Sequence, residues 1–132
     1  MGNRAVIKFG GTNQGIYLHW NGGIESVQAF LDCAKRYKLR SGCYGNARLC
    51  QIIGNFFGGS LSLGIDDVRF LDCDNYDNGM YVVNEHWEIT KREYDQGHNE
   101  GFNTRYYQEV FAECCKKNDA IFEYVAEVAE VV

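Results

Sequence analysis

The order in which strand-like and helix-like patterns follow one another constrains the fold of this 132-residue chain most. Residues 4–9 and 16–20 are apolar runs that flank a glycine-rich turn, as the two strands of a β-hairpin do. Two amphipathic helical patterns follow, over residues 24–37 and 46–57, and Gly58 with Gly59 should stop the second. The first half of the chain therefore reads as a hairpin followed by two helices.

The second half lacks the regular alternation of strands and helices that builds parallel sheets. Strands are expected over residues 61–65, 80–83 and 87–91, the last two joined around Asn84 and Glu85. From residue 104 on the pattern is helical, and Asn118-Asp119 could divide it, with Asp119 as an N-cap. Because hairpins dominate, the sequence predicts an α+β fold in one domain (1–132). It would be a mainly antiparallel sheet of about five strands, with three or four helices packed on one face.

The cellular setting is indicated by what the chain contains. No stretch approaches the roughly 20 apolar residues of a membrane span, and the first residues do not resemble a signal peptide. Of the six cysteines, Cys33, Cys50 and Cys114 fall on the apolar stripes of helical patterns, which is typical of buried thiols in a reducing cytosol. We therefore expect a cytoplasmic protein with free thiols and no membrane contact.

The two halves of the chain carry opposite charge. Residues 1–59 contain seven bases and two acids, whereas residues 60–132 contain six bases and sixteen acids, although the whole chain has a net charge of −5. The simpler interpretation is that the halves attract each other within one fold. The alternative is an anion-binding first half, or an acidic surface that faces a basic partner.

A loop before the first helix has the ingredients of a nucleotide pocket. Asn21, Gly22 and Gly23 precede a helix start, where free backbone N–H groups can bind phosphate. Aromatic rings stack on bases and arginine pairs with phosphate, so we place Trp20, Arg40 and Arg48 in the same candidate site. The simpler interpretation is that Asn21 caps the helix, the glycines form a turn and Trp20 belongs to the core.

An acidic loop is the candidate for a metal site. Asp72, Asp74 and Asp77 offer oxygen ligands of the kind that Ca²⁺ prefers, and Asn78, Gly79 and Glu85 follow Asp74 with EF-hand-like spacing. However, Tyr76 stands at position 3 of that loop, where an EF-hand has a ligand, and the flanks read as strands instead of helices. A polar turn is the simpler interpretation, and no cofactor is predicted.

Three stretches carry a resemblance to a known group: residues 15–31 (GIYLHWNGGIESVQAFL), 44–66 (YGNARLCQIIGNFFGGSLSLGID) and 72–83 (DCDNYDNGMYVV). They resemble small accessory proteins of phages and mobile elements of Gram-positive bacteria, over roughly residues 4–92. The resemblance implies an antagonist of bacterial immunity in the host cytoplasm, and it carries no catalytic residues. We therefore expect a non-enzymatic protein that sequesters a small nucleotide-derived immune signal.

Two alternatives belong to other classes. The first is a protein–protein inhibitor of a host defence nuclease, comparable to anti-CRISPR proteins, which would fill a basic channel with the acidic second half. Its acids would include Glu109, Glu113, Glu123, Glu127 and Glu130. The second is a metal-dependent enzyme that uses Asp66 and Asp67 together with the acidic loop. In each case oppositely charged halves and many aromatic residues favour a homo-oligomer.

Overall fold

The structure is a computed structural model. It describes residues 3–59, 62–95 and 101–131, and for residues 123–131 it describes the backbone only. The elements follow in this order: β1 (Ala5–Phe9), β2 (Gln14–Leu18), α1 (Ile24–Arg36), α2 (Cys43–Phe57), β3 (Leu63–Asp67), the short 3-10 helix η1 (Val68–Phe70), β4 (Met80–Val83), β5 (Ile89–Glu93) and α3 (Thr104–Val131).

The five strands form one mixed sheet in the order β3-β2-β1-β4-β5. Three of the four pairings are antiparallel, which confirms the predicted α+β fold with a mostly antiparallel sheet. The exception is the central pair, in which β1 and β4 run parallel with Val6 opposite Met80 and Phe9 opposite Val83. After β3 the chain crosses the sheet before it enters β4, so the expectation of hairpins alone missed this pair.

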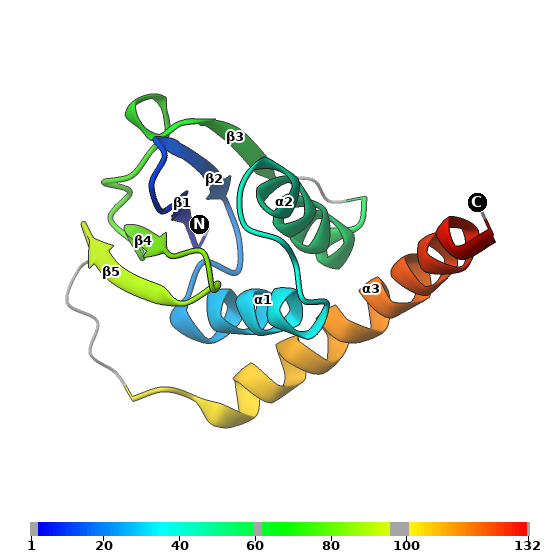
Figure 1. Cartoon of the computed structure of the whole chain (residues 1–132). Coiled ribbons are helices and arrows are strands. Elements are labelled where there is room, and N and C mark those ends of the chain that lie inside the picture. Colours follow the sequence, from blue (N-terminus) through cyan, green and yellow to red (C-terminus); the bar gives the residue numbers. More distant parts are fainter. Residues whose placement is uncertain (1–2, 60–61, 96–100, 132) are drawn as a thin grey trace.

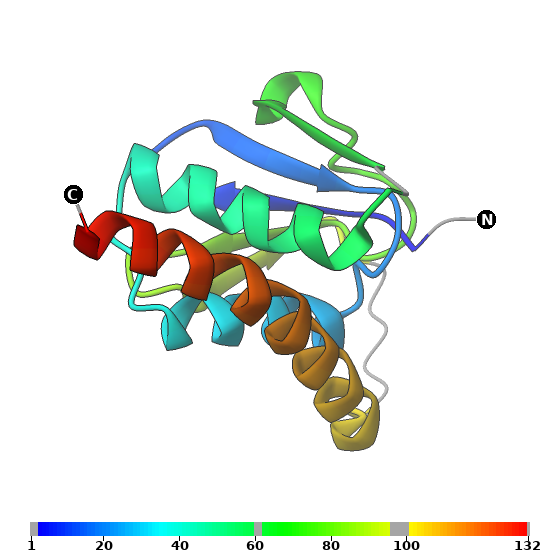
Figure 2. The same cartoon turned by 90° about the vertical axis from the view of Figure 1, so that its right-hand side faces the viewer.

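The helices lie on one side of the sheet in two layers (Figures 1 and 2). α1 and α2 pack on the sheet, and α3 crosses the outer side of both helices. The core joins alternate residues of the strands, such as Ile7, Ile16 and Tyr81, to the apolar faces of the helices, such as Phe30 and Ile53. Alternation along the strands and helical spacing along α1 and α2 explain why these side chains meet.

The opposite face of the sheet is partly covered by the segment between β3 and β4. Val68 lies against the backbone of Gly15, where an added Cβ would come within 2.8 Å of its side chain. The thiol of Cys73 contacts both Val68 and the sulfur of Met80, and the buried Asn75 ties the following turn to Gly79. This polar turn is what the simpler interpretation of the acidic loop predicted.

α3 is a single helix of 28 residues, so the predicted break at Asn118-Asp119 is wrong. Asn118 is fully buried, and its amide donates hydrogen bonds to the carbonyl oxygens of Ile52 and Cys114. Asp119 does not cap a helix. Instead it accepts hydrogen bonds from Arg36 and Tyr37 of the first half. Contacts with α1 and α2 satisfy these polar groups, so the helix continues where local propensity favoured a stop.

Element boundaries differ from the sequence patterns where the backbone adopts left-handed conformations. Gly42 has φ 88° and precedes α2, which begins at Cys43 instead of residue 46. Trp87 has φ 60°, and β5 begins at Ile89 instead of residue 87. The predicted stop of the second helix is confirmed, because Gly58 has φ 64° at the C-cap of α2.

All six cysteines are free thiols, and Cys33 and Cys114 are fully buried in the core. Among the helices in the described part of the chain, none is long and apolar enough to cross a membrane.

Candidate anion-binding site

A basic pocket lies where the connection between α1 and α2 meets the first turns of α2. Its volume is about 230 Å³, and its lining residues are Tyr37, Lys38, Leu39, Arg40, Tyr44, Gly45 and Arg48. Three of these are cations and none is an acid. The predicted residues Arg40 and Arg48 thus come together in one hollow, although eight positions separate them in the sequence.

Close backbone packing fixes the shape of this connection. Lys38 has φ 52°, which turns the chain away from the end of α1. The indole N–H of Trp87 donates a hydrogen bond to the carbonyl oxygen of Leu39. Gly45 is buried against the same turn, where an added Cβ would lie only 1.6 Å from the carbonyl oxygen of Arg40. The loop that carries the cations is therefore held against the sheet and α2.

Ion pairing separates the cations of the pocket from most others in the first half. Arg4 pairs with Asp77 at 2.8 Å, Arg36 with Asp119 at 2.8 Å, and Lys35 with Asp32 at 3.5 Å. Within the described residues, the remaining four bases of the first half form no ion pair: Lys8, Lys38, Arg40 and Arg48. Three of these four line the basic pocket.

The partners of Arg4 and Arg36 explain part of the charge asymmetry. Both arginines lie in the basic half and both bind aspartates of the acidic half. Although burial opposes it, hydrogen bonds from Arg4 hold the pKa of Asp77 below its usual value. These pairs show attraction between the two halves within one fold, as the simpler interpretation predicted. The basic pocket contains cations that do not take part in this pairing.

Two tyrosine rings border the pocket, one exposed and one engaged in contacts of the fold. The side chain of Tyr44 is 77% exposed, so its ring is open to a ligand. Tyr37 is occupied, because its hydroxyl donates to Asp119 and its ring packs against Phe122 with centroids 4.8 Å apart. Burial and the hydrogen bond to Asp119 raise the pKa of Tyr37. Arg48 also packs on Phe122, and its guanidinium carbon lies 4.9 Å from the centroid of that ring.

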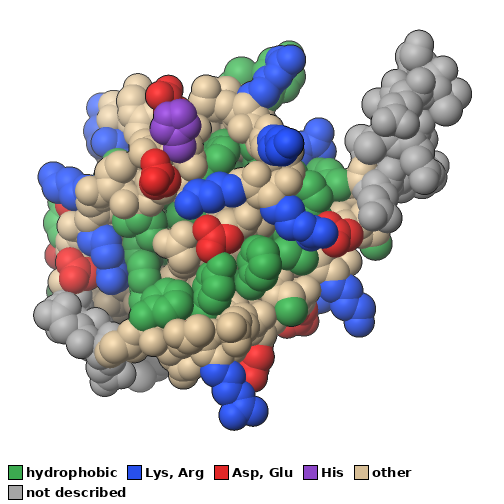
Figure 3. Space-filling model, turned by 60° about the horizontal axis from the view of Figure 1, so that its bottom comes forward, with side chains coloured by type: hydrophobic (Ala, Val, Ile, Leu, Met, Phe, Trp, Pro, Cys, Tyr) green, Lys and Arg blue, Asp and Glu red, His purple; other side chains and the backbone are tan. Residues whose placement is uncertain are grey.

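The wider surface shows the same mixture of charge and apolar groups. Figure 3 shows the face formed by α1 and α3, where Lys and Arg side chains surround a band of hydrophobic side chains. On α3, the rings of Tyr107 and Phe111 are stacked with centroids 5.8 Å apart. The Tyr107 hydroxyl donates to Asp32, and burial together with this bond raises the pKa of Tyr107 to about 12.

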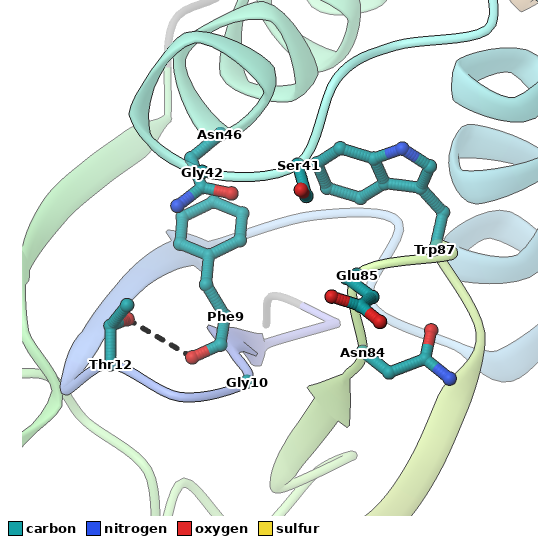
Figure 4. Close-up of a pocket in the computed structure, with 9 residues that line it drawn as sticks. All are labelled: Phe9, Gly10, Thr12, Ser41, Gly42, Asn46, Asn84, Glu85 and Trp87. Carbon is teal, nitrogen blue, oxygen red and sulfur yellow. Dashed lines mark hydrogen bonds between the residues drawn. The ribbon is translucent and has the colours of Figure 1, made fainter.

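A second hollow, the edge cleft, lies on the sheet side of the same loop (Figure 4). It has a volume of about 190 Å³ and lies where β1 and β4 end, lined by Phe9, Gly10, Thr12, Ser41, Gly42, Asn46, Asn84, Glu85 and Trp87. The carboxyl ends of parallel strands are a frequent ligand position in α/β sheets. The cleft lies at the end of the parallel pair of β1 and β4, which the sequence patterns did not predict.

Two polar side chains of the edge cleft, Thr12 and Asn84, are committed to local turns. The Thr12 hydroxyl donates to the carbonyl oxygen of Phe9. The Asn84 side chain accepts hydrogen bonds from the backbone of His86 and Glu88. Glu85 adds a negative charge that points toward the space between the rings of Phe9 and Trp87 (Figure 4). The cleft is thus less suited to an anion than the basic pocket.

The other predicted ligand residues lie at the opposite end of α1. Residues 20–23 precede α1, whereas Arg40 and Arg48 lie beyond its end, so the 13 residues of α1, about 20 Å, separate them. The structure therefore divides the predicted site into two places. Trp20 is 42% exposed and does not belong to the core, and Gly23 is the N-cap, so Asn21 does not cap the helix.

Residues 20–23 are occupied by hydrogen bonds of the fold. The backbone N–H of Gly22 donates to Asn3, and its carbonyl oxygen accepts from the hydroxyl of Tyr81. The Asn21 amide donates to the hydroxyl of Ser26. A hollow of about 340 Å³ opens beside Gly23, and its lining combines the carboxylate of Glu25 with the guanidinium of Arg92. The lining of the basic pocket contains no carboxylate.

The acidic residues considered as metal ligands do not converge. Arg4 holds Asp77 and also lies 3.6 Å from Asp72, and Asp67 is paired with Arg69. In the part of the chain that the structure describes, no three His, Cys, Asp or Glu side chains lie close enough to hold a metal ion. Asp72 and Asp74 both line a hollow on the far face of the sheet, but the cations Lys8 and Arg69 line it as well.

The acids considered for a protein partner are partly neutralised. Glu109 pairs with Arg105 at 3.5 Å and Glu113 pairs with Lys117 at 3.1 Å, both along α3. The side chains of Glu123, Glu127 and Glu130 lie outside the described residues. The described part of α3 is thus a helix face of mixed charge.

Comparison with protein-family models, curated proteins and solved structures finds no match for this chain.

Proposed function

We propose that this protein is a non-enzymatic binding protein that sequesters a small phosphate-bearing nucleotide at the basic pocket. One observation carries the proposal: Lys38, Arg40 and Arg48 converge without an ion pair among the described residues, beside the exposed ring of Tyr44. Cations gathered without acids repel one another, and a bound anion would relieve this repulsion. The resemblance to phage accessory proteins supports a role against nucleotide signals of bacterial immunity.

The size of the pocket narrows the mode of binding. A volume of about 230 Å³ lies below the roughly 300–1,000 Å³ of pockets that enclose a drug-sized ligand. The pocket therefore suits the phosphate and part of the sugar, while the base would remain outside it and stack on Tyr44. Base–aromatic stacking contributes about 1–3 kcal/mol and tolerates different bases.

Calorimetric titration of the full chain with nucleotides and cyclic dinucleotides tests the proposal. Removing a charge-assisted hydrogen bond costs roughly 1.5–3 kcal/mol, so Arg40→Ala or Arg48→Ala should each weaken binding about tenfold or more. Tyr44→Ala should weaken it as well, whereas Tyr44→Phe should retain it because the ring remains. Native mass spectrometry of the purified protein would reveal a nucleotide that stays bound through purification.

Arg105→Ala is the matched control, because it removes an exposed arginine of α3 that lies outside the basic pocket. Its affinity for the nucleotide should equal that of the unmodified chain. Equal losses for Arg105→Ala and Arg48→Ala would mean that net charge alone attracts the ligand. If no nucleotide binds at any concentration tested, the proposed function is wrong.

A further inference from the structure

The hollow beside Gly23 lies where the starts of several elements meet. Asn3 precedes β1, Asn78 precedes β4 and Asn103 precedes α3, and all three line the hollow together with residues of α1 and β5. The hollow is therefore at the beginning of the parallel pair of β1 and β4, whereas the edge cleft is at its end. Its volume of about 340 Å³ is near the lower limit for ligand pockets, which suits a small ligand.

Two side chains of opposite charge line this hollow, which we call the mixed-charge hollow. Glu25 lies in the first turn of α1, and Arg92 lies in the edge strand β5. The two do not pair with each other, and within the described part of the chain neither has another ion-pair partner. A ligand that carries both charges could therefore satisfy both side chains at once.

The fold holds the guanidinium of Arg92 in place and leaves part of it available. Its carbon lies 4.4 Å from the ring centroid of Tyr81, and one terminal nitrogen donates to the carbonyl oxygen of Asn78 at 3.0 Å. The Nε atom is buried and has no hydrogen-bond partner among the described residues. Because buried polar groups are nearly always hydrogen-bonded, this unpaired donor calls for an explanation, and a ligand in the hollow would supply one. A guanidinium anchored in this way suits a carboxylate.

The buried hydroxyl of Tyr81 lies within the field of both charges. Burial raises the pKa of Tyr81, the charge of Arg92 opposes this rise, and the charges of Glu25 and Asp95 add to it. The same hydroxyl donates a hydrogen bond to the carbonyl oxygen of Gly22, just before α1. Arg92 and Glu25 thus approach one buried group from two different elements, which brings the two charges to the same part of the molecule.

The asparagines supply polar groups without net charge. The side-chain oxygen of Asn3 accepts a hydrogen bond from the amide of Asn78, and that of Asn103 accepts one from the backbone of Tyr106. The amide nitrogen of Asn3 lies 3.6 Å from the position that a Cβ on Gly23 would occupy, so it stands beside the start of α1. These amides can add hydrogen bonds to a polar ligand that the two charged side chains hold.

The combination of charges decides which class of ligand fits. A phosphate or another plain anion would meet Arg92 but would be repelled by Glu25. The terminus of a peptide carries only one of the two charges. A free α-amino acid carries an ammonium and a carboxylate on the same carbon, and it is small enough for a hollow of this volume.

We propose that the mixed-charge hollow binds a small polar α-amino acid, with its carboxylate at Arg92 and its ammonium at Glu25. The asparagines in the lining favour a polar side chain on this ligand. The inference does not depend on the nucleotide site, which lies beyond the other end of α1.

Calorimetric titration of the full chain with L-serine, L-asparagine and L-glutamine tests the proposal. At least one of them should bind saturably at millimolar or lower concentration. The N-acetyl derivative of that amino acid lacks the ammonium charge, and its amide derivative lacks the carboxylate charge. Each derivative should therefore bind about tenfold more weakly or less.

Two variants test the role of each charge. Glu25→Gln keeps the shape of the side chain and should weaken binding of the amino acid about tenfold, while removing the preference over the N-acetyl derivative. Arg92→Gln should weaken binding by a similar factor and remove the preference over the amide. The Glu25 side chain forms no hydrogen bond within the described structure, so its variant keeps the test decisive even if Arg92→Gln does not fold, as checked by circular dichroism.

The matched controls are Glu109→Gln, which removes an exposed glutamate of α3, and Arg48→Ala, which alters the basic pocket. Neither residue lines the mixed-charge hollow, so both variants should bind the amino acid like the unmodified chain. Glu25→Gln should in turn keep its affinity for nucleotide, so failure of the amino-acid site and failure of the proposed function are distinguishable.

Three results would overturn the proposal. The first is no saturable binding of any of the three amino acids at millimolar concentration. The second is an N-acetyl derivative or acetate that binds as tightly as the amino acid and binds more tightly to Glu25→Gln, because the hollow would then be a plain anion site. The third is an equal loss for Glu109→Gln and Glu25→Gln, because net charge alone would then explain the effect.

Discussion

The two ends of α1 are built alike but differ in what they leave available. A non-glycine residue with positive φ flanks each end, Asn21 at 56° and Lys38 at 52°. Each end also has a glycine packed against another stretch of backbone. Gly22 lies against Asn3 before the helix, and Gly45 lies against Arg40 beyond it. At the first end, hydrogen bonds of the fold occupy the loop and Glu25 adds negative charge. At the second end, three cations remain without an ion pair among the described residues.

The difference shows that a glycine-rich loop before a helix is not sufficient for anion binding. Helix N-termini attract anions only where their N–H groups and the surrounding charges are free. In the loop at residues 20–23, the backbone N–H of Gly22 is already bonded to Asn3, and Glu25 adds a negative charge nearby. The end of α1 has the opposite dipole, yet the side chains after it supply the positive charge.

Glycine substitutions at the two ends should have the largest effect. Gly45→Ala would place a Cβ 1.6 Å from the carbonyl oxygen of Arg40, so we expect a loss of more than about 3 kcal/mol or failure to fold. Gly22→Ala would place a Cβ 2.6 Å from the carbonyl oxygen of Asn3, with an expected loss of about 1–3 kcal/mol. Urea unfolding monitored by circular dichroism measures both changes.

Gly23→Ala is the control for these variants, because its added Cβ would have no neighbour closer than 3.6 Å. Its stability should change by less than about 1 kcal/mol. If Gly22→Ala and Gly45→Ala proved as mild as this control, the backbone at the ends of α1 would be less tightly packed than the structure indicates.

Ligand binding should separate the two ends more sharply than stability does. Asn21→Ala and Glu25→Gln alter the loop and hollow before α1, and nucleotide affinity should stay within about twofold of that of the unmodified chain. Arg48→Ala beyond the other end should weaken it about tenfold. Titration calorimetry under identical salt conditions compares the three variants. A tenfold loss for Asn21→Ala would move the site to the beginning of α1.

The smallest expected effect concerns the ion pair that ties α3 to the end of α1. The Tyr37 hydroxyl and the guanidinium of Arg36 hold the pKa of Asp119 below its usual value. This carboxylate therefore stabilises the fold above about pH 4, and the contribution is lost as the pH falls through the lower pKa of the folded state. Since Arg36 and Asp119 are partly exposed, Asp119→Asn should cost only up to about 1 kcal/mol at neutral pH.

Thermal unfolding across the pH range measures this contribution. The difference in Tm between the unmodified chain and Asp119→Asn should be present at pH 7 and should shrink toward pH 3. Glu109→Gln, which removes an ion pair to the highly exposed Arg105, should show a smaller difference. A difference that stays constant down to pH 3 would mean that the carboxylate charge does not contribute.

Local patterns were sufficient for much of the fold. The strand over residues 80–83 and the helix from Ile24 match their predicted positions closely, because alternation and helical spacing are visible in consecutive residues. The break at Asn118-Asp119 was predicted from the local preference of these residues, and contacts with α1 and α2 override it. The start of α2 depended on Gly42, whose backbone conformation the sequence pattern did not reveal.

The sequence by itself determined the number of strands, the mostly antiparallel character of the sheet, the two central helices and the opposite charge of the two halves. Only the tertiary structure decided that β4 runs parallel to β1, that Arg40 and Arg48 share a pocket, and which cations are already paired. The physical reason is range. Periodicity acts between neighbours in the chain, whereas strand partners and ion pairs join residues as distant as Arg4 and Asp77, and only folding brings such residues together.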